Sequence, residues 1–207
     1  MKTKEKIMAA ALDLFSEKGY KAVSMEEIAG KVGIKAPSIY KHFSGKQEIF
    51  AAIIEELQSR YSDFSAALKL DGSDTKQDAD FYAGLTEDSL VKMGVELFSF
   101  FLHDEQTVKF RKLMTMEQYR CPELARLYTE QYFDRPLLYH SQIFTLLGQK
   151  GILEVSNPEL MALQFVSPIL QLIELTDRDP AREEEAREKI RAHIQQFTLA
   201  YGCKVTR

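Results

Sequence analysis

The stretch from Ser24 to Lys46 constrains this chain more than any other, because it carries the start and stop signals of two short helices. Ser24 is followed three residues later by Glu27, which is the spacing of a capping box at the beginning of a helix. Apolar residues then recur with the period of one helical face: Met25, Ile28, Ala29 and Val32. Gly33 permits the left-handed backbone that ends many helices. The pattern therefore predicts a short helix that ends at Gly33.

A second short helix is predicted directly after this turn. Pro37 suits a first helical turn, where no amide hydrogen is needed. Ile39 and Phe43 lie four residues apart, on one helical face. Two short helices joined by a turn of three or four residues are typical of the helix-turn-helix motif. We expect this motif to span about residues 24–43.

On a helical wheel, with about 100° per residue, the side chains of the second helix fall on distinct faces. Ile39 and Phe43 point to the core, and Pro37 and Lys41 lie roughly opposite them. The flanks carry polar groups, Ser38 and His42 on one side and Tyr40 on the other. A small front for base edges and polar flanks for phosphates would suit a DNA groove. A solvated helical hairpin with ordinary surface lysines is the alternative, and the helical pattern alone does not decide between them.

A longer helix should follow, from near Gly45 to about Leu68. Ser44 and Gln47 have the spacing of a second capping box. Apolar residues recur at threes and fours along it: Ile49, Ile53, Leu57, Tyr61, Phe64 and Leu68. A helix of about 24 residues would span about 36 Å. Because a continuous helix transmits a rotation, we expect this element to be the lever of any switch.

Residues 11–50, ALDLFSEKGYKAVSMEEIAGKVGIKAPSIYKHFSGKQEIF, resemble the N-terminal domain of the tetracycline-repressor (TetR) family of bacterial transcription regulators. The matching segments are LFSEKGY, MEEIA, GIKAPSIYKHF and SGKQEIF, in this order and spacing. The resemblance is close over about residues 5–55 and continues beyond them only as a helical layout. It implies an all-α fold of about nine helices, with a three-helix DNA-binding domain (1–46) joined by a long helix to a ligand-binding and dimerisation domain (47–207).

The resemblance and the helical wheel together assign DNA contacts. Ala36, Pro37 and Lys41 would approach bases, and Lys35 would meet either bases or phosphates. The expected phosphate contacts are Ser24, Ser38, Tyr40, His42 and Lys46. Lys41 is the residue expected to read a guanine, at about 1–3 kcal/mol of discrimination. A homodimer would place two recognition helices in successive major grooves of a palindromic operator, ~34–36 Å apart.

The charge distribution favours this interpretation of the N-terminal region. The whole chain has a net charge of −4, but residues 1–50 hold nine lysines and six acidic residues, a net of +3. The remainder holds 18 basic and 25 acidic residues, a net of −7. The basic excess is confined to the segment with the motif. Because it is modest, DNA affinity would depend on dimerisation and well-placed contacts.

Several features favour a cytoplasmic protein, one that joins the nucleoid when bound to DNA. We find no apolar run that approaches the ~18 residues a membrane span needs. The N-terminal apolar run is short and is followed by Asp13 and Glu17, so it is not a signal peptide. Cys121 and Cys203 lack a CxxC context, which suits a reducing cytosol and two buried or idle thiols.

Residues 71–85, DGSDTKQDADFYAGL, read as a mobile, solvated linker. Its acidic residues lack the spacing of an EF-hand: Asp71, Asp74, Asp78 and Asp80. One further helix is predicted over about Thr3 to Lys18, where Ile7, Ala10, Ala11, Leu14 and Phe15 make an apolar stripe. Others are predicted over about 86–103, 105–119 and 122–150. Pro136 is expected to bend or break the last of these, and Gly148 and Gly151 to close it.

The middle of the chain is rich in aromatic residues and methionine, which favours an apolar or aromatic effector bound between long helices. The candidate contacts are Phe98, Phe101, Met114, Glu117, Tyr132, His140 and Phe144. For each of them an ordinary core or surface position is the alternative. The sequence does not name the effector, the operator or the direction of the response.

Two terminal helices complete the predicted domain. Asn157 and Pro158 begin one that is apolar nearly all round, with Pro168 expected to kink it, and Asp179 and Pro180 begin the other. Such a pair could form a four-helix dimer interface with a second copy. The expected interface residues are Leu163, Val166, Leu170, Ile173, Ile190, Ile194, Phe197 and Tyr201.

Chemistry outside DNA binding has little support in the sequence. The four histidines lack metal-ligand spacing, and no glycine-rich phosphate loop, GxSxG elbow or dinucleotide fingerprint occurs, so we predict no metal, no cofactor and no enzyme. The favoured hypothesis is a ligand-responsive homodimeric repressor. The other hypotheses are a helical small-molecule-binding or adaptor protein without DNA binding, and an all-helical enzyme.

Overall fold

The computed structural model describes residues 2–202, and in them the secondary structure is helical apart from one isolated bridge between Leu153 and Gly202. The all-α prediction is confirmed. The described residues divide into two compact units, one formed by residues up to 61 together with 104–128, and one by 62–103 together with 129 onward. These bounds differ from the predicted 1–46 and 47–207, because the helix after residue 104 packs with the N-terminal helices. Cys203 lies outside the described residues.

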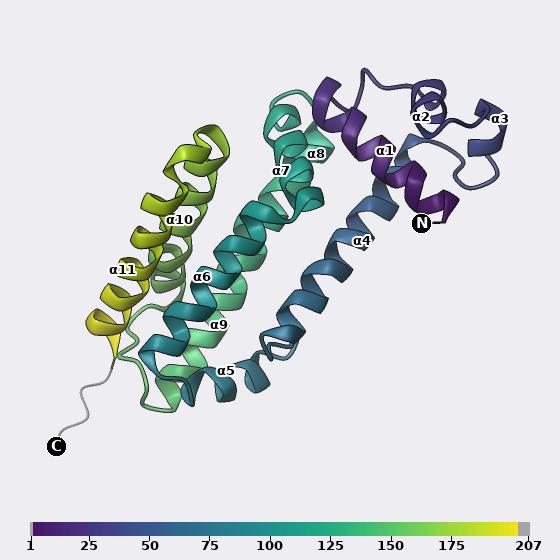
Figure 1. The fold of residues 1–207 in the computed structure, drawn as a ribbon. Helices are drawn as coiled ribbons and strands as arrows, with labels where there is room; N and C mark the ends of the chain where they lie inside the picture. The colour runs from purple at the N-terminus through teal and green to yellow at the C-terminus, as the bar shows by residue number, and fades with distance from the viewer. Residues whose placement is uncertain (1, 203–207) are drawn as a thin grey trace. The chain divides into compact units, whose positions relative to one another are not determined.

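The first unit has six helical elements (Figure 1). They are α1 (Thr3–Lys18), α2 (Met25–Val32), α3 (Ala36–Ile39), the first part of α4 (Lys46–Ala67), α7 (Glu105–Glu117) and α8 (Pro122–Thr129). The bounds of α1 are those predicted from its apolar stripe. Aromatic rings join α1, the following turn, α4 and α7: Phe15–Tyr20 at 5.1 Å, Tyr20–Phe50 at 5.3 Å and Phe50–Phe110 at 6.0 Å between centroids.

The capping box predicted for α4 has a different partner. Glu48 accepts hydrogen bonds from the backbone amide (2.6 Å) and the hydroxyl (2.8 Å) of Ser44, and Gln47 is exposed. Because α4 begins at Lys46, Glu48 occupies the third helical position and reaches back over the helix start. These hydrogen bonds lower the pKa of the Glu48 carboxyl, so it is ionised where the helix dipole favours a negative charge.

The second unit contains the end of α4 and the remaining helices (Figure 1). They are α5 (Thr75–Ala83), α6 (Glu87–His103), a π-helical turn (Glu130–Asp134), α9 (Arg135–Gln149), α10 (Pro158–Arg178), a 3-10 turn (Pro180–Arg182) and α11 (Glu183–Tyr201). One core joins α6, α10 and α11 around Phe98 and Ile190. Another joins α5, α9, α10 and α11 around Phe144 and Phe197.

The linker prediction for residues 71–85 was wrong, since α5 occupies most of this stretch. Asp78 is fully buried rather than solvated. Its carboxylate accepts from the amides of Asp71 (2.7 Å) and Gly72 (2.9 Å) and from the Tyr139 hydroxyl (2.8 Å). The polar composition of this stretch suggested a solvated linker, because the donors that allow Asp78 to be buried lie mostly outside α5.

The helix predicted over 122–150 is interrupted just before Pro136, as expected. A π-helical turn separates α8 from α9. Pro136 has no amide hydrogen to offer the carbonyl four residues earlier, so the regular α-helical ladder cannot pass through it. At the other end Gly151 takes φ = 71°, and the amide of Ile152 bonds the carbonyl of Leu147 (2.9 Å), which closes α9.

Among the described residues, α10 is the one helix that is long and apolar enough to cross a membrane by composition, with a mean hydropathy of 1.2. Its sequence has no unbroken apolar run of that length, because polar residues such as Gln164, Ser167 and Gln171 interrupt it. It lies in the helical bundle of the second unit, where Met161, Val166 and Ile173 are buried. Of its apolar window 28% is buried, and many of its other side chains are half-buried.

Candidate nucleic-acid interface

The capping box that begins α2 is present in both directions. The Glu27 amide donates to Ser24 Oγ (3.1 Å), and the Ser24 amide donates to Glu27 Oε2 (2.8 Å). Lys18 Nζ pairs with Glu27 at 2.8 Å, and these partners hold the pKa of the Glu27 carboxyl below its usual range. Gly33 ends α2 in the left-handed region, with φ = 79° and ψ = 28°. The short helix predicted between Ser24 and Gly33 is therefore formed.

The recognition segment has an apolar back and an exposed front. Ile39 is fully buried and Phe43 is 1% exposed. The regular part of α3 is only four residues long, but the Phe43 amide still bonds the Ile39 carbonyl (3.0 Å), which extends the helical path. The predicted contacts that lie exposed are Lys35, Pro37, Tyr40, Lys41 and His42. Ser24, Ala36 and Ser38 are half-buried beside them.

Lys46 has a different environment from the other expected phosphate contacts. Its ammonium donates to the carbonyls of Val23 (2.5 Å), Tyr20 (3.0 Å) and Lys21 (3.4 Å). An ammonium has three N–H donors, and all three have backbone partners here. In this structure the Lys46 side chain therefore turns back onto the loop between α1 and α2.

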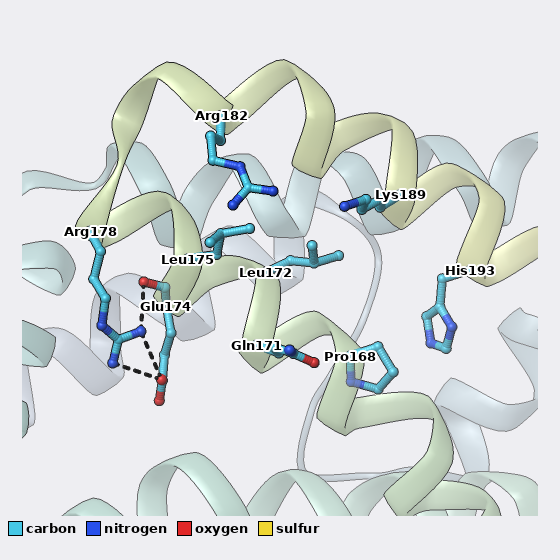
Figure 2. Close-up of a pocket in the computed structure, with 9 residues that line it drawn as sticks. All are labelled: Pro168, Gln171, Leu172, Glu174, Leu175, Arg178, Arg182, Lys189 and His193. Carbon is cyan, nitrogen blue, oxygen red and sulfur yellow. Dashed lines mark hydrogen bonds and ion pairs between the residues drawn. The ribbon is translucent and has the colours of Figure 1, made fainter.

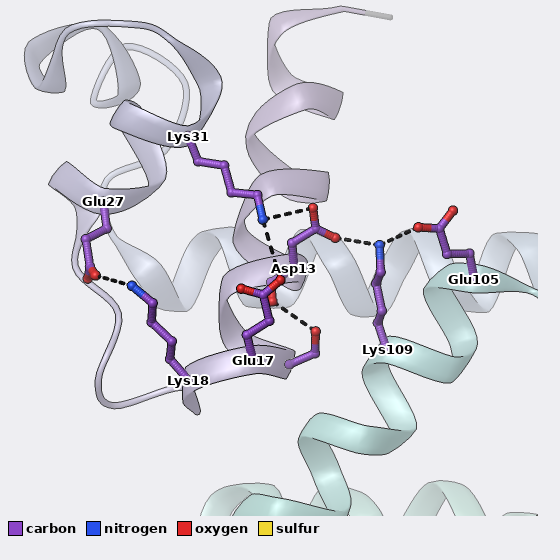
Figure 3. Close-up of polar contacts among 8 residues, drawn as sticks. Asp13, Glu17, Lys18, Glu27, Lys31, Glu105 and Lys109 are labelled. Atoms are coloured by element: carbon purple, nitrogen blue, oxygen red, sulfur yellow. Dashed lines mark hydrogen bonds and ion pairs between the residues drawn. The ribbon is translucent and has the colours of Figure 1, made fainter. Parts of the chain in front are cut away.

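A cluster of charges ties α1 to α2 and α7 (Figure 3). Asp13 lies 2.6 Å from Lys109 Nζ and 3.2 Å from Lys31 Nζ. Lys109 also pairs with Glu105 at 2.5 Å. Burial raises the pKa of the Asp13 carboxyl, but the two lysines outweigh burial and leave that pKa below its ordinary value. The cluster fixes α7 beside the DNA-binding helices, an arrangement that no local pattern in the sequence indicated.

The seven expected effector contacts are divided between the units. Met114 and Glu117 lie buried in the first unit, where Glu117 Oε1 accepts from the Tyr20 amide (3.2 Å). Phe98, Phe101, Tyr132, His140 and Phe144 belong to the second. Of these, the rings of His140 and Phe144 lie 6.0 Å apart. Burial lowers the pKa of His140, whose Nδ1 donates to the Pro136 carbonyl (2.8 Å), so the ring is a neutral member of an aromatic cluster.

A groove of about 640 Å³ lies between α10 and α11 (Figure 2). Pro168, Leu172 and Leu175 are its apolar lining, and the other lining residues are polar or charged: Gln171, Glu174, Arg178, Arg182, Lys189 and His193. Those cations are paired: Arg178 with Glu174 (3.1 Å), and Arg182 and Lys189 with Glu185 (2.8 and 2.5 Å). None of the seven expected effector contacts lines this groove.

The structure corrects part of the predicted dimer interface. Val166, Ile173, Ile190, Ile194 and Phe197 are all buried within a single chain. The apolar seam of α11 packs on α6 and α10 instead of facing outward. The apolar side chains that these helices expose are Leu160 and Leu163 (each 48% exposed) and Leu199 (74%). Leu170 and Tyr201 are half-buried.

A helix-turn-helix with a cationic, exposed recognition segment, followed by a helical domain, defines a class of regulatory DNA-binding folds. Residues 7–53 match the family model of bacterial regulatory proteins, tetR family. Residues 88–203 match the C-terminal domain of AefR-like transcriptional repressors. The chain belongs to the TetR family of bacterial regulatory proteins, as its N-terminal sequence motifs indicated. This is a family of transcription regulators rather than of enzymes.

Individual relatives match parts of the chain. The biofilm operon icaADBC negative regulator IcaR of Staphylococcus epidermidis is 39% identical over 61 residues, which are 30% of this chain and 33% of IcaR. The transcriptional activator FasR of Mycolicibacterium smegmatis is 26% identical over 78% of this chain and 66% of FasR. The chain thus spans about a third to two thirds of these relatives. The solved flavonoid-responsive regulator FrrA is 25% identical, with a TM-score of 0.64 and 98% of each chain covered.

Proposed function

We propose that this protein is a DNA-binding transcription regulator that acts as a homodimer on a palindromic operator. The observation that carries the proposal is the recognition segment. Ile39 and Phe43 are buried, which turns Pro37, Tyr40 and Lys41 outward together. Lys41 at the front would read a base edge, and Tyr40 and His42 would hold phosphates on either side. Such a protein works in the cytoplasm and is found on the nucleoid when bound to DNA.

Dimerisation through α10 and α11 would provide the second recognition segment. Leu160, Leu163 and Leu199 are exposed on these two helices, and Pro168, Leu172 and Leu175 line part of the groove between them. A second copy seated there would cover this surface and complete a four-helix interface. Paired half-sites would then lie ~34–36 Å apart, one helical turn of DNA.

Two relatives differ in whether they repress or activate transcription. IcaR is a negative regulator and FasR is an activator. The match of residues 88–203 to a repressor C-terminal domain favours repression for this chain.

A small-molecule effector is part of the proposal, because FrrA responds to flavonoids and shares the whole length of the fold. The aromatic residues of the second unit favour an apolar or aromatic compound. Such an effector must prefer the state that does not bind DNA, since equal affinity for both states shifts nothing. A coupling of about 1–3 kcal/mol between effector and DNA is typical. The helix α4 is shared by both units and would carry that coupling.

The decisive experiment is selection of binding sites from random duplexes, followed by measurement of the affinity for the selected site between about 50 and 200 mM salt. Over this salt range, six to ten phosphate contacts would lower the affinity by about three to five decades. We expect an inverted repeat and a steep fall of affinity with salt. Failure to enrich any duplex would favour a helical small-molecule-binding or adaptor protein instead. A screen of apolar and aromatic compounds against the complex would then identify the effector by release of the DNA.

A further inference from the structure

The turn between α1 and α2, residues 19–23, is held by two side chains of opposite charge that come from distant parts of the chain. From α4, Lys46 Nζ donates to the carbonyls of Tyr20, Lys21 and Val23. From α7, Glu117 Oε1 accepts from the amide of Tyr20 at 3.2 Å. Both backbone polar groups of Tyr20 are therefore bonded to charged side chains.

The two side chains are well placed for a structural role. Glu117 is 4% exposed, so its carboxylate has little access to a ligand in solution. Gly19 takes φ = 87°, and a Cβ at this position would collide with Glu117 Oε1. The backbone conformation therefore favours glycine here, and a larger residue would also push the Glu117 carboxylate from its place.

The side chain of Tyr20 is fixed by the same neighbours. Lys46 Nζ lies 5.0 Å from the centroid of the Tyr20 ring, a cation–π distance. The ring also contacts Phe15 and Phe50. Lys21 Nζ adds a bond to the carbonyl of Arg120, just after α7 (3.4 Å). The turn is therefore anchored to α1, α4 and α7 at once.

We propose that Lys46 and Glu117 are positioning residues, which clamp the turn at Tyr20 and so fix where α2 and the recognition segment begin. This role replaces the expected phosphate contact at Lys46 and the expected effector contact at Glu117. Val23, whose carbonyl accepts from Lys46, directly precedes Ser24, the N-cap of α2. A displaced turn would move the N-cap and, with it, the exposed front of α3. The inference rests on the proposed DNA-binding function for its consequence, but the clamp itself can be measured without DNA.

The first test separates positioning from phosphate binding by salt dependence. The variants are Lys46→Met and, as a matched control outside the DNA-binding helices, Lys76→Met, an exposed lysine on α5 that should change neither the affinity nor the slope. A lost phosphate contact lowers the slope of log affinity against log salt by about 0.9. We expect Lys46→Met to weaken binding to the selected duplex about tenfold at every salt concentration, without a change of slope. A slope reduced by about 0.9 in Lys46→Met would show a phosphate contact and overturn the proposal.

The second test uses Glu117, with Gln as the conservative variant. Glu117→Gln keeps an acceptor oxygen and should leave DNA affinity within about twofold of wild type, whereas Glu117→Leu should weaken it about tenfold. Equal losses in both variants, or a loss of effector affinity without a loss of DNA affinity, would contradict the clamp.

Amide hydrogen exchange on the full chain makes the result independent of DNA. The Tyr20 amide should exchange slowly in wild type and Glu117→Gln, and at least about tenfold faster in Glu117→Leu and Lys46→Met. Absence of DNA binding by wild type would refute the proposed function, and the exchange rate of the Tyr20 amide would still test the clamp. Unchanged exchange at Tyr20 in both variants would refute the clamp by itself.

Discussion

The hydroxyl of Tyr139 donates to the carboxylate of Asp78 across 61 positions of the sequence, with 2.8 Å between the oxygens. Asp78 is fully buried, and a buried carboxylate is tolerated only where donors replace its hydration. Burial, with smaller contributions from Tyr82 and Asp78, raises the pKa of Tyr139, so its phenol remains a donor at neutral pH. The pair fastens the turn before α5 to α9 and makes this region a folded part of the second unit.

Tyr139→Phe should destabilise the protein by about 1–3 kcal/mol, because Asp78 stays buried but loses one of its three donors. Urea unfolding followed by circular dichroism measures the free energy of unfolding. Tyr119→Phe is the matched control, since Tyr119 is 91% exposed and its hydroxyl has access to water. Equal stabilities of the two variants would show that the bond to Asp78 contributes nothing.

Lys41→Ala and Tyr40→Phe should affect DNA binding in different ways. Lys41→Ala should relax the preference at one base pair, with a loss of about 1–3 kcal/mol on the preferred site. Tyr40→Phe should weaken all duplexes alike, because a phosphate contact carries no sequence information. Affinities for the selected operator and its single-base variants measure both effects. Lys76→Ala, an exposed lysine on α5, is the control. If neither recognition variant changes binding, α3 is not the DNA-contacting element.

The Asp13 cluster predicts a loss of stability in acid. The pKa of Asp13 is lowered from 3.8 in the folded protein, because its pairs with Lys109 and Lys31 outweigh the effect of burial. A carboxyl with a depressed pKa stabilises the fold above its unfolded pKa, and this contribution is lost as pH falls through the folded value. Asp13→Asn should therefore be less stable than wild type at pH 7, and the difference should shrink below about pH 4.

Thermal unfolding of wild type and Asp13→Asn from pH 7 to pH 3 measures this effect. Glu26→Gln, which removes an exposed carboxylate of α2, is the control. A stability difference between wild type and Asp13→Asn that does not change with pH would rule out the ionised pair as its source.

Leu163→Asp should weaken the proposed dimer at least about tenfold, equivalent to about 1.4 kcal/mol, by placing a charge in the apolar interface. Sedimentation equilibrium measures the dissociation constant. Leu138→Asp is a matched control, because Leu138 is 59% exposed on α9, outside the expected surface. A dimer weakened equally by both substitutions, or by neither, would place the interface elsewhere.

Sequence patterns predicted the elements whose signals are local. The apolar stripe of residues 3–18 fixed the bounds of α1, and Ser24 with Glu27 marked the start of α2. The burial of Ile39 and Phe43 also followed from helical spacing. These predictions hold because a helix and its caps are made by residues three or four positions apart.

The environment of individual side chains could not be predicted in this way. Lys46 looked like a free cation, Asp78 like part of a solvated linker, and Ile190 like an interface residue. In the fold Lys46 reaches carbonyls 23 to 26 positions away, Asp78 meets Tyr139, and Ile190 packs against α6 and α10. No local signal distinguishes a charged side chain that water solvates from one that a distant backbone group binds.

The sequence by itself thus determined most of the helices, the helix-turn-helix and the family, because hydrophobic period and capping act over single turns of helix, whereas α5 was missed. The tertiary structure alone decided which charged side chains bind backbone groups near the recognition segment and which apolar faces remain exposed. The physical reason is that burial and hydrogen-bond satisfaction depend on which elements pack together, and those partners are separated by tens of residues along the chain.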